Sequence, residues 1–249
     1  MNLKKTIAAF AVSAALVTGA VAENHPYGMD IALGVVGVEY CSATFKEWGS
    51  DLVLSHNVID IFPLKVNTYI CPWLDNHLGI YGSIGFLPGV YCNNKIKARG
   101  AEFKSDSVGF NFGVEFMVGP AFGVDLGESS VRFQIGAPFH FLVGCGAMVL
   151  DTDYRTVSEI RNDAIGVTFS AFGLGLTPQF RFAANKRCSF VVGMDFVFDF
   201  VYNETWEADN ITDRGNGVYT DKFSPTAGAD STFRFGWIPY LGVGINFGN

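Results

Sequence analysis

Two segments of the chain alternate between apolar residues and small or polar ones almost without interruption. In residues 108–118 the even positions are all Val or Phe, and the odd positions between them are Gly, Asn, Glu and Met. In residues 131–143 the odd positions are Val, Phe, Ile and Ala, and their even neighbours include Arg, Gln, Gly and His. A period of two places alternate side chains on opposite faces of a β-strand. Each segment is therefore predicted to be a strand with one Phe-rich face and one face of glycine and polar groups.

This pairing of faces favours a barrel in a lipid bilayer over a soluble sandwich. Glycine weakens a strand whose polar face meets water, whereas a bilayer barrel turns large apolar side chains to lipid and fills its interior with small and polar ones. The chain has 24 Phe and is 49% hydrophobic. Beyond residue 22 it has no apolar run of about 18 residues, the length that suggests a spanning helix. Only helices and closed barrels satisfy every backbone polar group within lipid, so a barrel is predicted.

The N-terminus has the form of an export signal. Lys4 and Lys5 precede an apolar stretch at residues 6–20, and Ala20, Val21 and Ala22 form a cleavage site of the A-x-A type. We expect residues 1–22 to be removed and residues 23–249 to form a single barrel domain. An uncleaved N-terminal anchor is the alternative.

The charge of the chain argues against nucleic acid as a partner. The full sequence carries a net charge of −7. Loss of Lys4 and Lys5 with the signal lowers the net charge of the mature chain to −9. Nucleic-acid binding proteins need a basic surface instead.

The two-residue period predicts eight strands in all. Besides the two already described, they lie near residues 29–41, 58–71, 78–92, 165–182, 188–202 and 232–247. Three connections are short, at residues 72–77, 125–129 and 183–187. Four are long and polar, at residues 42–57, 93–107, 151–164 and 203–231. Short periplasmic turns alternating with longer outside loops are typical of outer-membrane barrels. The predicted fold is an all-β, eight-stranded, antiparallel up-and-down transmembrane β-barrel in a bacterial outer membrane.

Some residues disturb this pattern. The apolar face of the first strand changes side near Gly37, which predicts a bulge. Prolines also fall inside predicted strands, among them Pro63, Pro138, Pro178 and Pro239. A closed barrel has no free edge to accommodate proline. We therefore expect bulges or kinks there, and a lateral opening in the wall for an apolar substrate is the alternative.

The whole mature chain resembles the small bacterial outer-membrane barrels, the broad group that includes OmpW, OmpX and the opacity proteins. The most specific element is the last strand, residues 233–247, which ends in Gly-Val-Gly-Ile-Asn-Phe. In that group an amphipathic final strand with a terminal aromatic residue is the signal read by the barrel-assembly machinery. The resemblance assigns this role to Tyr240, Ile245 and Phe247. Gly248 and Asn249 follow Phe247, which departs from the group's pattern.

Charged and polar side chains on the minor faces of the strands are the candidates for lining the lumen. They are Lys65, Glu115, Arg132, Gln134, His140, Arg181, Asp195, Asp199 and Arg234. Two uses are open: an internal network that fills the barrel, and a narrow polar conduit or small binding cavity. An eight-stranded barrel has room for little more than its own side chains, which favours the network.

Catalysis and metal binding are not expected. Of the four His only His140 falls on a predicted strand, and it faces the lumen, away from a lipid substrate. No spacing supplies it with a Ser or an acid as partner, so a lipid-modifying barrel enzyme is a minor alternative. The five Cys are odd in number, and their spacing fits no metal site. We expect free thiols, and no cofactor.

The resemblance to the OmpW-like group implies a small pore or carrier for small molecules, hydrophobic ones included. The alternative is a non-transporting surface protein whose loops bind a partner, or whose barrel stabilises the envelope. The expected partners are outer-membrane lipid, the barrel-assembly machinery, a small apolar solute and an extracellular ligand held by the loops.

Overall fold

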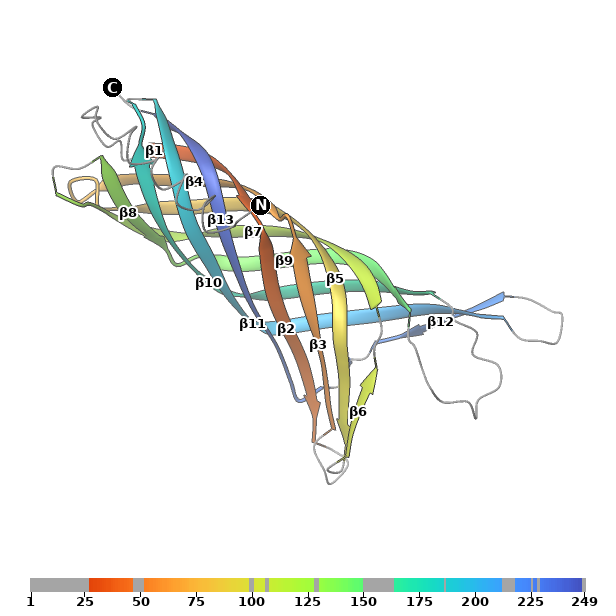
Figure 1. Ribbon diagram of the computed structural model, residues 1–249. Helices are drawn as coiled ribbons and strands as arrows, with labels where there is room; N and C mark the ends of the chain where they lie inside the picture. The colour runs from red at the N-terminus through yellow and green to blue at the C-terminus, as the bar shows by residue number, and fades with distance from the viewer. Residues whose placement is uncertain are drawn as a thin grey trace.

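The computed structural model describes residues 27–46, 52–98, 101–105, 108–127, 130–149, 164–185, 187–211, 218–224, 226–227 and 229–247. These residues form antiparallel strands that close into a tilted barrel (Figure 1). The part of the chain that the structure describes holds no helix able to span a membrane. The predicted signal peptide, residues 1–22, lies outside the described residues.

Thirteen strand segments make up the sheet. They are β1 (Tyr27–Gly34), β2 (Val36–Phe45), β3 (Leu52–Ile61), β4 (Leu64–Trp73), β5 (Leu78–Ala98), β6 (Ala101–Ser105), β7 (Val108–Asp125), β8 (Val131–Gly136), β9 (Phe139–Val149), β10 (Ala164–Ala183), β11 (Cys188–Ile211), β12 (Val218–Phe223) and β13 (Ser231–Phe247). Five pairs of segments continue one another along the wall: β1 with β2, β3 with β4, β6 with β7, β8 with β9, and β12 with β13. The wall therefore has eight strands, as predicted.

The first and last strands close the ring. β1 pairs with β13 from Tyr27 opposite Phe247 to Gly34 opposite Tyr240, and β2 continues the pairing beyond the break. All neighbours are antiparallel and follow one another along the chain. The up-and-down antiparallel barrel is thus confirmed.

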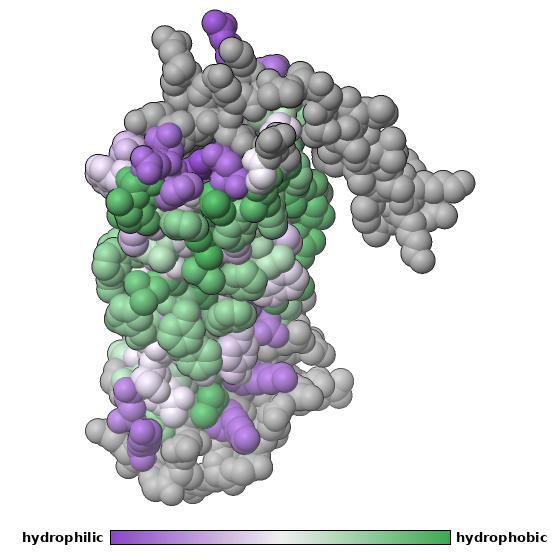
Figure 2. Space-filling view, turned by 90° about the vertical axis from the view of Figure 1, so that its left-hand side faces the viewer, coloured by the Kyte–Doolittle hydropathy of each residue, from purple (hydrophilic) through white to green (hydrophobic). Residues whose placement is uncertain are grey.

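The alternation that predicted the strands also separates the two surfaces of the wall. Phe112 and Phe116 on β7 are exposed on the outside, whereas Asn111 and Glu115, which directly precede them, are buried. Figure 2 shows the outward apolar side chains as a continuous hydrophobic band, with hydrophilic residues above and below it. This is the surface that a barrel presents to a bilayer.

The predicted irregularity of the first strand lies at Val35, two residues before Gly37. Val35 separates β1 from β2, and Phe62 and Pro63 separate β3 from β4 on the neighbouring strand. Phe62 N donates to Val35 O at 3.3 Å, and Gly34 N donates to Pro63 O at 2.8 Å. The two breaks therefore lie side by side and stay hydrogen-bonded to each other.

The other three of these prolines also lie within a hydrogen-bonded wall. Pro138 lies between β8 and β9, where its carbonyl accepts a bond of 2.7 Å from Gly175 N. Pro178 interrupts the pairing of β10 with β11, and Pro239 keeps its place opposite Met194. Backbone bonds bridge the breaks at Pro63 and Pro138, so the described wall has no lateral opening at either one.

Three segments expected as loops, residues 42–57, 93–107 and 203–231, are largely extended hairpins. The fourth expected loop, residues 151–164, lies outside the described residues except for Ala164. β5 continues to Ala98 and pairs with β6, and β11 continues to Ile211 and pairs with β12. The β11–β12 hairpin projects beyond the barrel (Figure 1). The strand limits predicted from the sequence were too short, because the sequence of these extensions lacks the two-residue alternation of apolar residues on which the prediction depended.

We predict that the outward phenylalanines at mid-strand stabilise the protein through lipid contact. Phe116→Lys should lower the free energy of unfolding in lipid vesicles by about 2–4 kcal/mol, the cost of a cation near the bilayer midplane. Leu126→Lys, just after the end of β7, is the control and should cost about 0–1 kcal/mol. Equal costs for the two variants would contradict the assignment of the outer face.

Candidate functional site

The interior of the barrel holds all nine residues that the sequence indicated for the lumen. Each has at most 2% of its surface exposed: Lys65, Glu115, Arg132, Gln134, His140, Arg181, Asp195, Asp199 and Arg234. They come from strands all round the ring, so only barrel closure brings them together. Buried charges are tolerated when they are paired and hydrogen-bonded, and most of these are.

Arg234 on β13 joins two acids near the middle of the interior. Its Nε donates to Glu39 Oε2 at 2.9 Å, and its Nη2 contacts the other oxygen of the same carboxylate. Its Nη1 donates to Asp199 Oδ2 at 2.6 Å. The guanidinium thereby uses its fork geometry on two carboxylates from opposite neighbours, β2 and β11.

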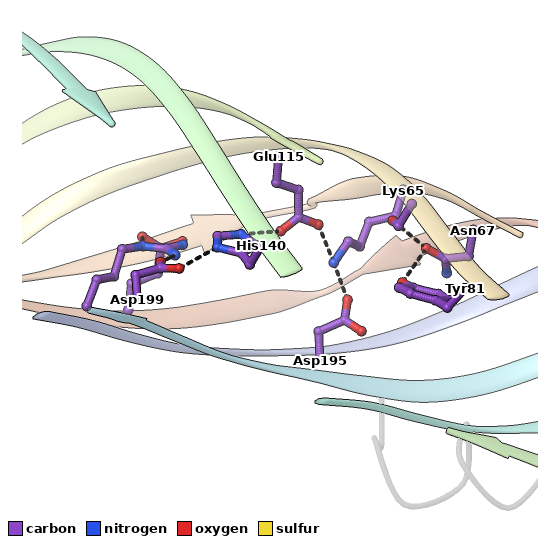
Figure 3. A network of polar contacts seen from close by, with 10 residues as sticks. Lys65, Asn67, Tyr81, Glu115, His140, Asp195 and Asp199 are labelled. Carbon is purple, nitrogen blue, oxygen red and sulfur yellow. Dashed lines mark hydrogen bonds and ion pairs between the residues drawn. The ribbon is translucent and has the colours of Figure 1, made fainter. Parts of the chain in front are cut away.

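His140 continues the series from Asp199 (Figure 3). Its Nδ1 lies 2.6 Å from Asp199 Oδ1, and its Nε2 lies 3.4 Å from Glu115 Oε2. With a carboxylate near each ring nitrogen, the surroundings favour the positively charged imidazolium.

Lys65 completes the series on the other side of Glu115. Its Nζ contacts one oxygen of Glu115 and one of Asp195. We name the lumen ion-pair chain by its seven members in contact order: Glu39, Arg234, Asp199, His140, Glu115, Lys65 and Asp195. The signs of the charges alternate along it. Asp195 and Asp199 are four residues apart on β11, so the chain runs along about 13 Å of the interior.

A second polar cluster fills the end of the barrel near the short turns. Arg181 Nη1 donates to Ser189 Oγ at 2.8 Å and to Asn246 Oδ1 at 2.7 Å, and Nη2 contacts Asp30. Gln179 Nε2 donates to Gln134 Oε1 at 2.8 Å. These bonds hold Gln134 and Arg181 in a closed network.

Further polar contacts extend the packing toward both ends of this region. Arg132 Nη1 donates to Asp125 Oδ1 at 3.0 Å at the short-turn rim. Near Lys65 on β4, Asn67 Oδ1 accepts bonds from Tyr81 Oη at 3.2 Å and Ser83 Oγ at 2.8 Å. The interior is therefore filled by its own side chains over this length.

Glycines opposite the large charged side chains provide the room for them. A Cβ at Gly85 would lie 2.5 Å from Glu115 Oε1, and one at Gly123 would lie 2.7 Å from an Arg132 nitrogen. The glycines of the minor faces are thus needed for a close approach of neighbouring strands' side chains.

Toward the long-loop end the interior becomes apolar and aromatic. The buried cluster there consists of Cys41, Val58, Leu87, Tyr91, Leu142, Val167, Phe169, Ala171, Tyr202 and Ile238, with Trp206 packed against it. It contains a narrow hollow whose lining side chains leave no room for a water-sized molecule at rest. The hollow is lined by Glu39, Cys41, Val58, Tyr91, Asn111, Phe169, Tyr202 and Arg234. One end of the lumen ion-pair chain therefore forms part of its lining.

Several interior residues were missed by sequence reasoning. His56 was expected in the first long loop, but it lies on β3 and is buried. Tyr202 Oη donates to Glu204 Oε2 at 3.1 Å and lies 3.3 Å from His56 Nε2, while Trp206 Nε1 donates to Glu204 Oε1 at 2.9 Å. The strand limits had excluded His56 and Glu204, because alternation was followed only through the lipid-facing part of each strand.

The remaining expectations concern assembly, thiols and metals. Tyr240 points inward and donates to Gln179 Oε1 at 3.2 Å, Ile245 points outward, and Phe247 is the last residue of β13. Their assembly role stays a prediction. The five Cys are free thiols. Among the described residues, no three His, Cys, Asp or Glu side chains form a metal-ligating group.

The lumen ion-pair chain should depend on Lys65. Lys65→Met leaves Glu115 and Asp195 without their shared cation, and breaking such a buried pair costs about 3–5 kcal/mol. Lys46→Met, the same change at an exposed residue, should stay within about 0.5 kcal/mol. Denaturant unfolding of both variants in lipid provides the measurement. The deficit of Lys65→Met should shrink as the pH falls, because the freed carboxylates can then take up protons. Similar stabilities for the two variants would refute this role.

Comparison with known proteins finds similarity in structure and not in sequence. No protein-family model and no curated protein sequence matches the chain. The major outer membrane protein of Thermus thermophilus matches with a TM-score of 0.50 at 13% identity, over 87% of this chain and 99% of that one. OprG from Pseudomonas aeruginosa gives 0.48 at 12% identity, over 92% and 100%. The outer membrane protease OmpT from Escherichia coli gives 0.44 at 8% identity, over 89% and 96%. Together with the closed ring and the apolar outer band, the Thermus match identifies the fold as that of a bacterial outer-membrane β-barrel protein.

Proposed function

We propose that this protein takes up small apolar molecules into the aromatic half of its interior, from the outer side of a bacterial outer membrane. The observation that carries the proposal is the hollow lined by Val58, Tyr91, Phe169 and Tyr202. Ligand sites are concave and mostly apolar, with a few polar groups that orient the ligand. Glu39, Asn111 and Arg234 supply those polar groups here.

An open aqueous pore is the less favoured form of the transport hypothesis. Lys65 contacts both Glu115 and Asp195, and none of the three has more than 1% of its surface exposed. A hydrated ion would have to separate these charges from one another to pass. A carrier that admits a solute to one half of the barrel needs no such separation at rest.

The hollow is closed at rest. Its lining side chains leave no room for a water-sized molecule, whereas an engineered cavity that holds benzene has a volume of about 150 Å³. A solute of about one ring therefore requires side chains such as Tyr202 to move.

Filling the hollow should abolish binding. Val58→Phe adds bulk to its lining, whereas Val66→Phe makes the same change on the lipid-facing side of β4. Binding of a one-ring aromatic such as toluene to the refolded protein in vesicles should weaken at least about tenfold in Val58→Phe, a loss of roughly 1.4 kcal/mol. It should be unchanged in Val66→Phe.

Planar-bilayer recordings test whether the interior conducts ions. The wild-type protein is expected to give no sustained single-channel current, because the side chains of the lumen ion-pair chain block the interior. Reproducible current steps that change in Arg132→Ala or Asp195→Ala would instead favour the polar conduit. The alternative of a non-transporting surface protein is supported by the projecting β11–β12 hairpin. Finding neither solute binding nor current would favour this alternative.

A further inference from the structure

Asp60 and Glu39 are diagonal neighbours on the inner face of the wall. In the pairing of β2 with β3, Asp60 lies opposite Gly37 and Glu39 lies opposite Val58, so the two acids are offset by two positions on adjacent strands. Diagonal neighbours on one face of an antiparallel pair are within reach of longer side chains. Both acids are buried, with 1% of Asp60 and 3% of Glu39 exposed.

Gly37 leaves room for the Asp60 side chain to turn toward β2. A Cβ at Gly37 would lie 2.8 Å from Asp60 Oδ2 and 3.1 Å from Asp60 Cβ. The Asp60 carboxyl thereby comes within hydrogen-bond reach of the Glu39 carboxyl. Two carboxylates cannot hydrogen-bond to each other, because an ionised carboxyl group only accepts. A bond between these two groups therefore requires a proton.

Glu39 is the ionised member of this pair. Arg234 holds both of its oxygens, through Nε on Oε2 at 2.9 Å and through Nη2 on Oε1. Asp60 has no comparable contact, since no donor in the described barrel reaches either of its oxygens. Each carboxylate oxygen accepts more than one bond, so Glu39 can accept from Asp60 while it holds Arg234. An ionised Asp60 would be a buried charge without compensation, which is strongly unfavourable.

The charges of the described interior point to the same acid. Seven buried acids face four buried Lys and Arg and two His, so at least one negative charge is in excess even when both His are charged. Six of those acids have side-chain contacts to cations or donors: Asp30, Glu39, Glu115, Asp195, Asp199 and Glu204. Asp60 is the seventh, and a proton would remove its charge.

We propose that Glu39 and Asp60 hold one proton between them in the folded barrel, so that Asp60 is neutral and donates a hydrogen bond to Glu39. Two carboxyl groups at contact distance do not both ionise readily. The proton comes from water during folding, because an Asp in an unfolded chain releases its proton above about pH 4.

The groups around Asp60 offer no other positive charge. The titratable and charged side chains that face it from the surrounding strands are Glu39 on β2, Tyr91 on β5, Glu115 on β7 and Arg234 on β13. Arg234 is the cation among them, and its three nitrogens are engaged by Glu39 and Asp199.

The shared proton has a consequence for the hollow, which rests on the proposed solute binding. Glu39 lines the hollow, and Arg234 balances its charge. Loss of the proton would place a second, unbalanced carboxylate beside this lining. The affinity for an apolar solute should therefore fall when the pair is deprotonated.

Infrared spectroscopy of the refolded full chain in vesicles tests the proton directly. A protonated carboxyl group has a carbonyl band that a carboxylate lacks. We expect such a band at neutral pH in the wild type and its loss in Asp60→Asn. Asp30→Asn is the matched control, because Asp30 is also fully buried but is paired with Arg181, and the band should stay. If Asp60→Asn does not refold, Asp60→Ala serves the same comparison.

Denaturant unfolding in vesicles between about pH 5 and pH 8 provides a second readout. The folded wild type carries a proton that the unfolded chain has lost, so its stability relative to Asp60→Asn falls as the pH rises. The ratio of folded to unfolded wild type should fall about tenfold per pH unit relative to the variant, up to the pH at which the Asp60 carbonyl band disappears.

The two Asn variants should also differ at neutral pH. The new amide of Asp60→Asn keeps a donor for Glu39, so this variant should be at least as stable as the wild type. Asp30→Asn should be less stable, because it leaves Arg181 without its carboxylate.

Three results would overturn the proposal: no carbonyl band at neutral pH that depends on Asp60, an Asp60→Asn variant as unstable as Asp30→Asn, or parallel pH dependences of the wild type and Asp60→Asn. Toluene binding separates the proposal from the proposed function. No binding at any pH would refute the function, and the infrared band would still decide the proton. Binding that stays unchanged when the band is lost would contradict the consequence for the hollow.

Discussion

Closure of the backbone hydrogen-bond ring is the constraint on which the rest of this structure depends. A strand edge in hydrocarbon has no water to satisfy it, so the first strand must pair with the last. β1 and β2 do so with β13, from Tyr27 opposite Phe247 to Ser231 opposite Thr44. The same demand explains why the breaks at Val35 and Pro63 face each other. An isolated bulge would leave backbone N–H and C=O groups without hydrogen-bond partners, whereas two neighbouring interruptions can hydrogen-bond to each other.

Closure of the barrel also determines which side chains must share the interior. Eight strands enclose a space that side chains fill, and strands from all sides bring their charges into it. The lumen ion-pair chain makes the burial of these charges tolerable, because positive and negative members alternate from Glu39 to Asp195. Beyond Arg234 most of the interior side chains are aromatic or aliphatic, with His56 and Glu204 buried near them, so the two ends of the interior differ in polarity.

The sequence allowed good prediction wherever lipid imposes a two-residue period. Glu115, Arg132 and His140 were placed inside because their neighbours are Phe, Val and Ile. Residues beyond the lipid band were not predictable in this way. His56 and Glu204 lie on strand extensions with no apolar face, and they were expected in loops. Asp60 lies next to the face switch at Val35 and Pro63, where alternation is ambiguous on both neighbouring strands.

The sequence by itself determined the class of fold, the number of wall strands and the face on which each mid-strand residue lies, because alternation reports directly on contact with lipid. It could not determine which interior groups meet. Asp30 and Arg181 are 151 positions apart, and Glu39 and Arg234 are 195 apart. Strand register and ring closure alone bring them into contact. Tertiary structure likewise decided that the polar groups indicated by the sequence close on one another, and that Asp60 lies beside Glu39.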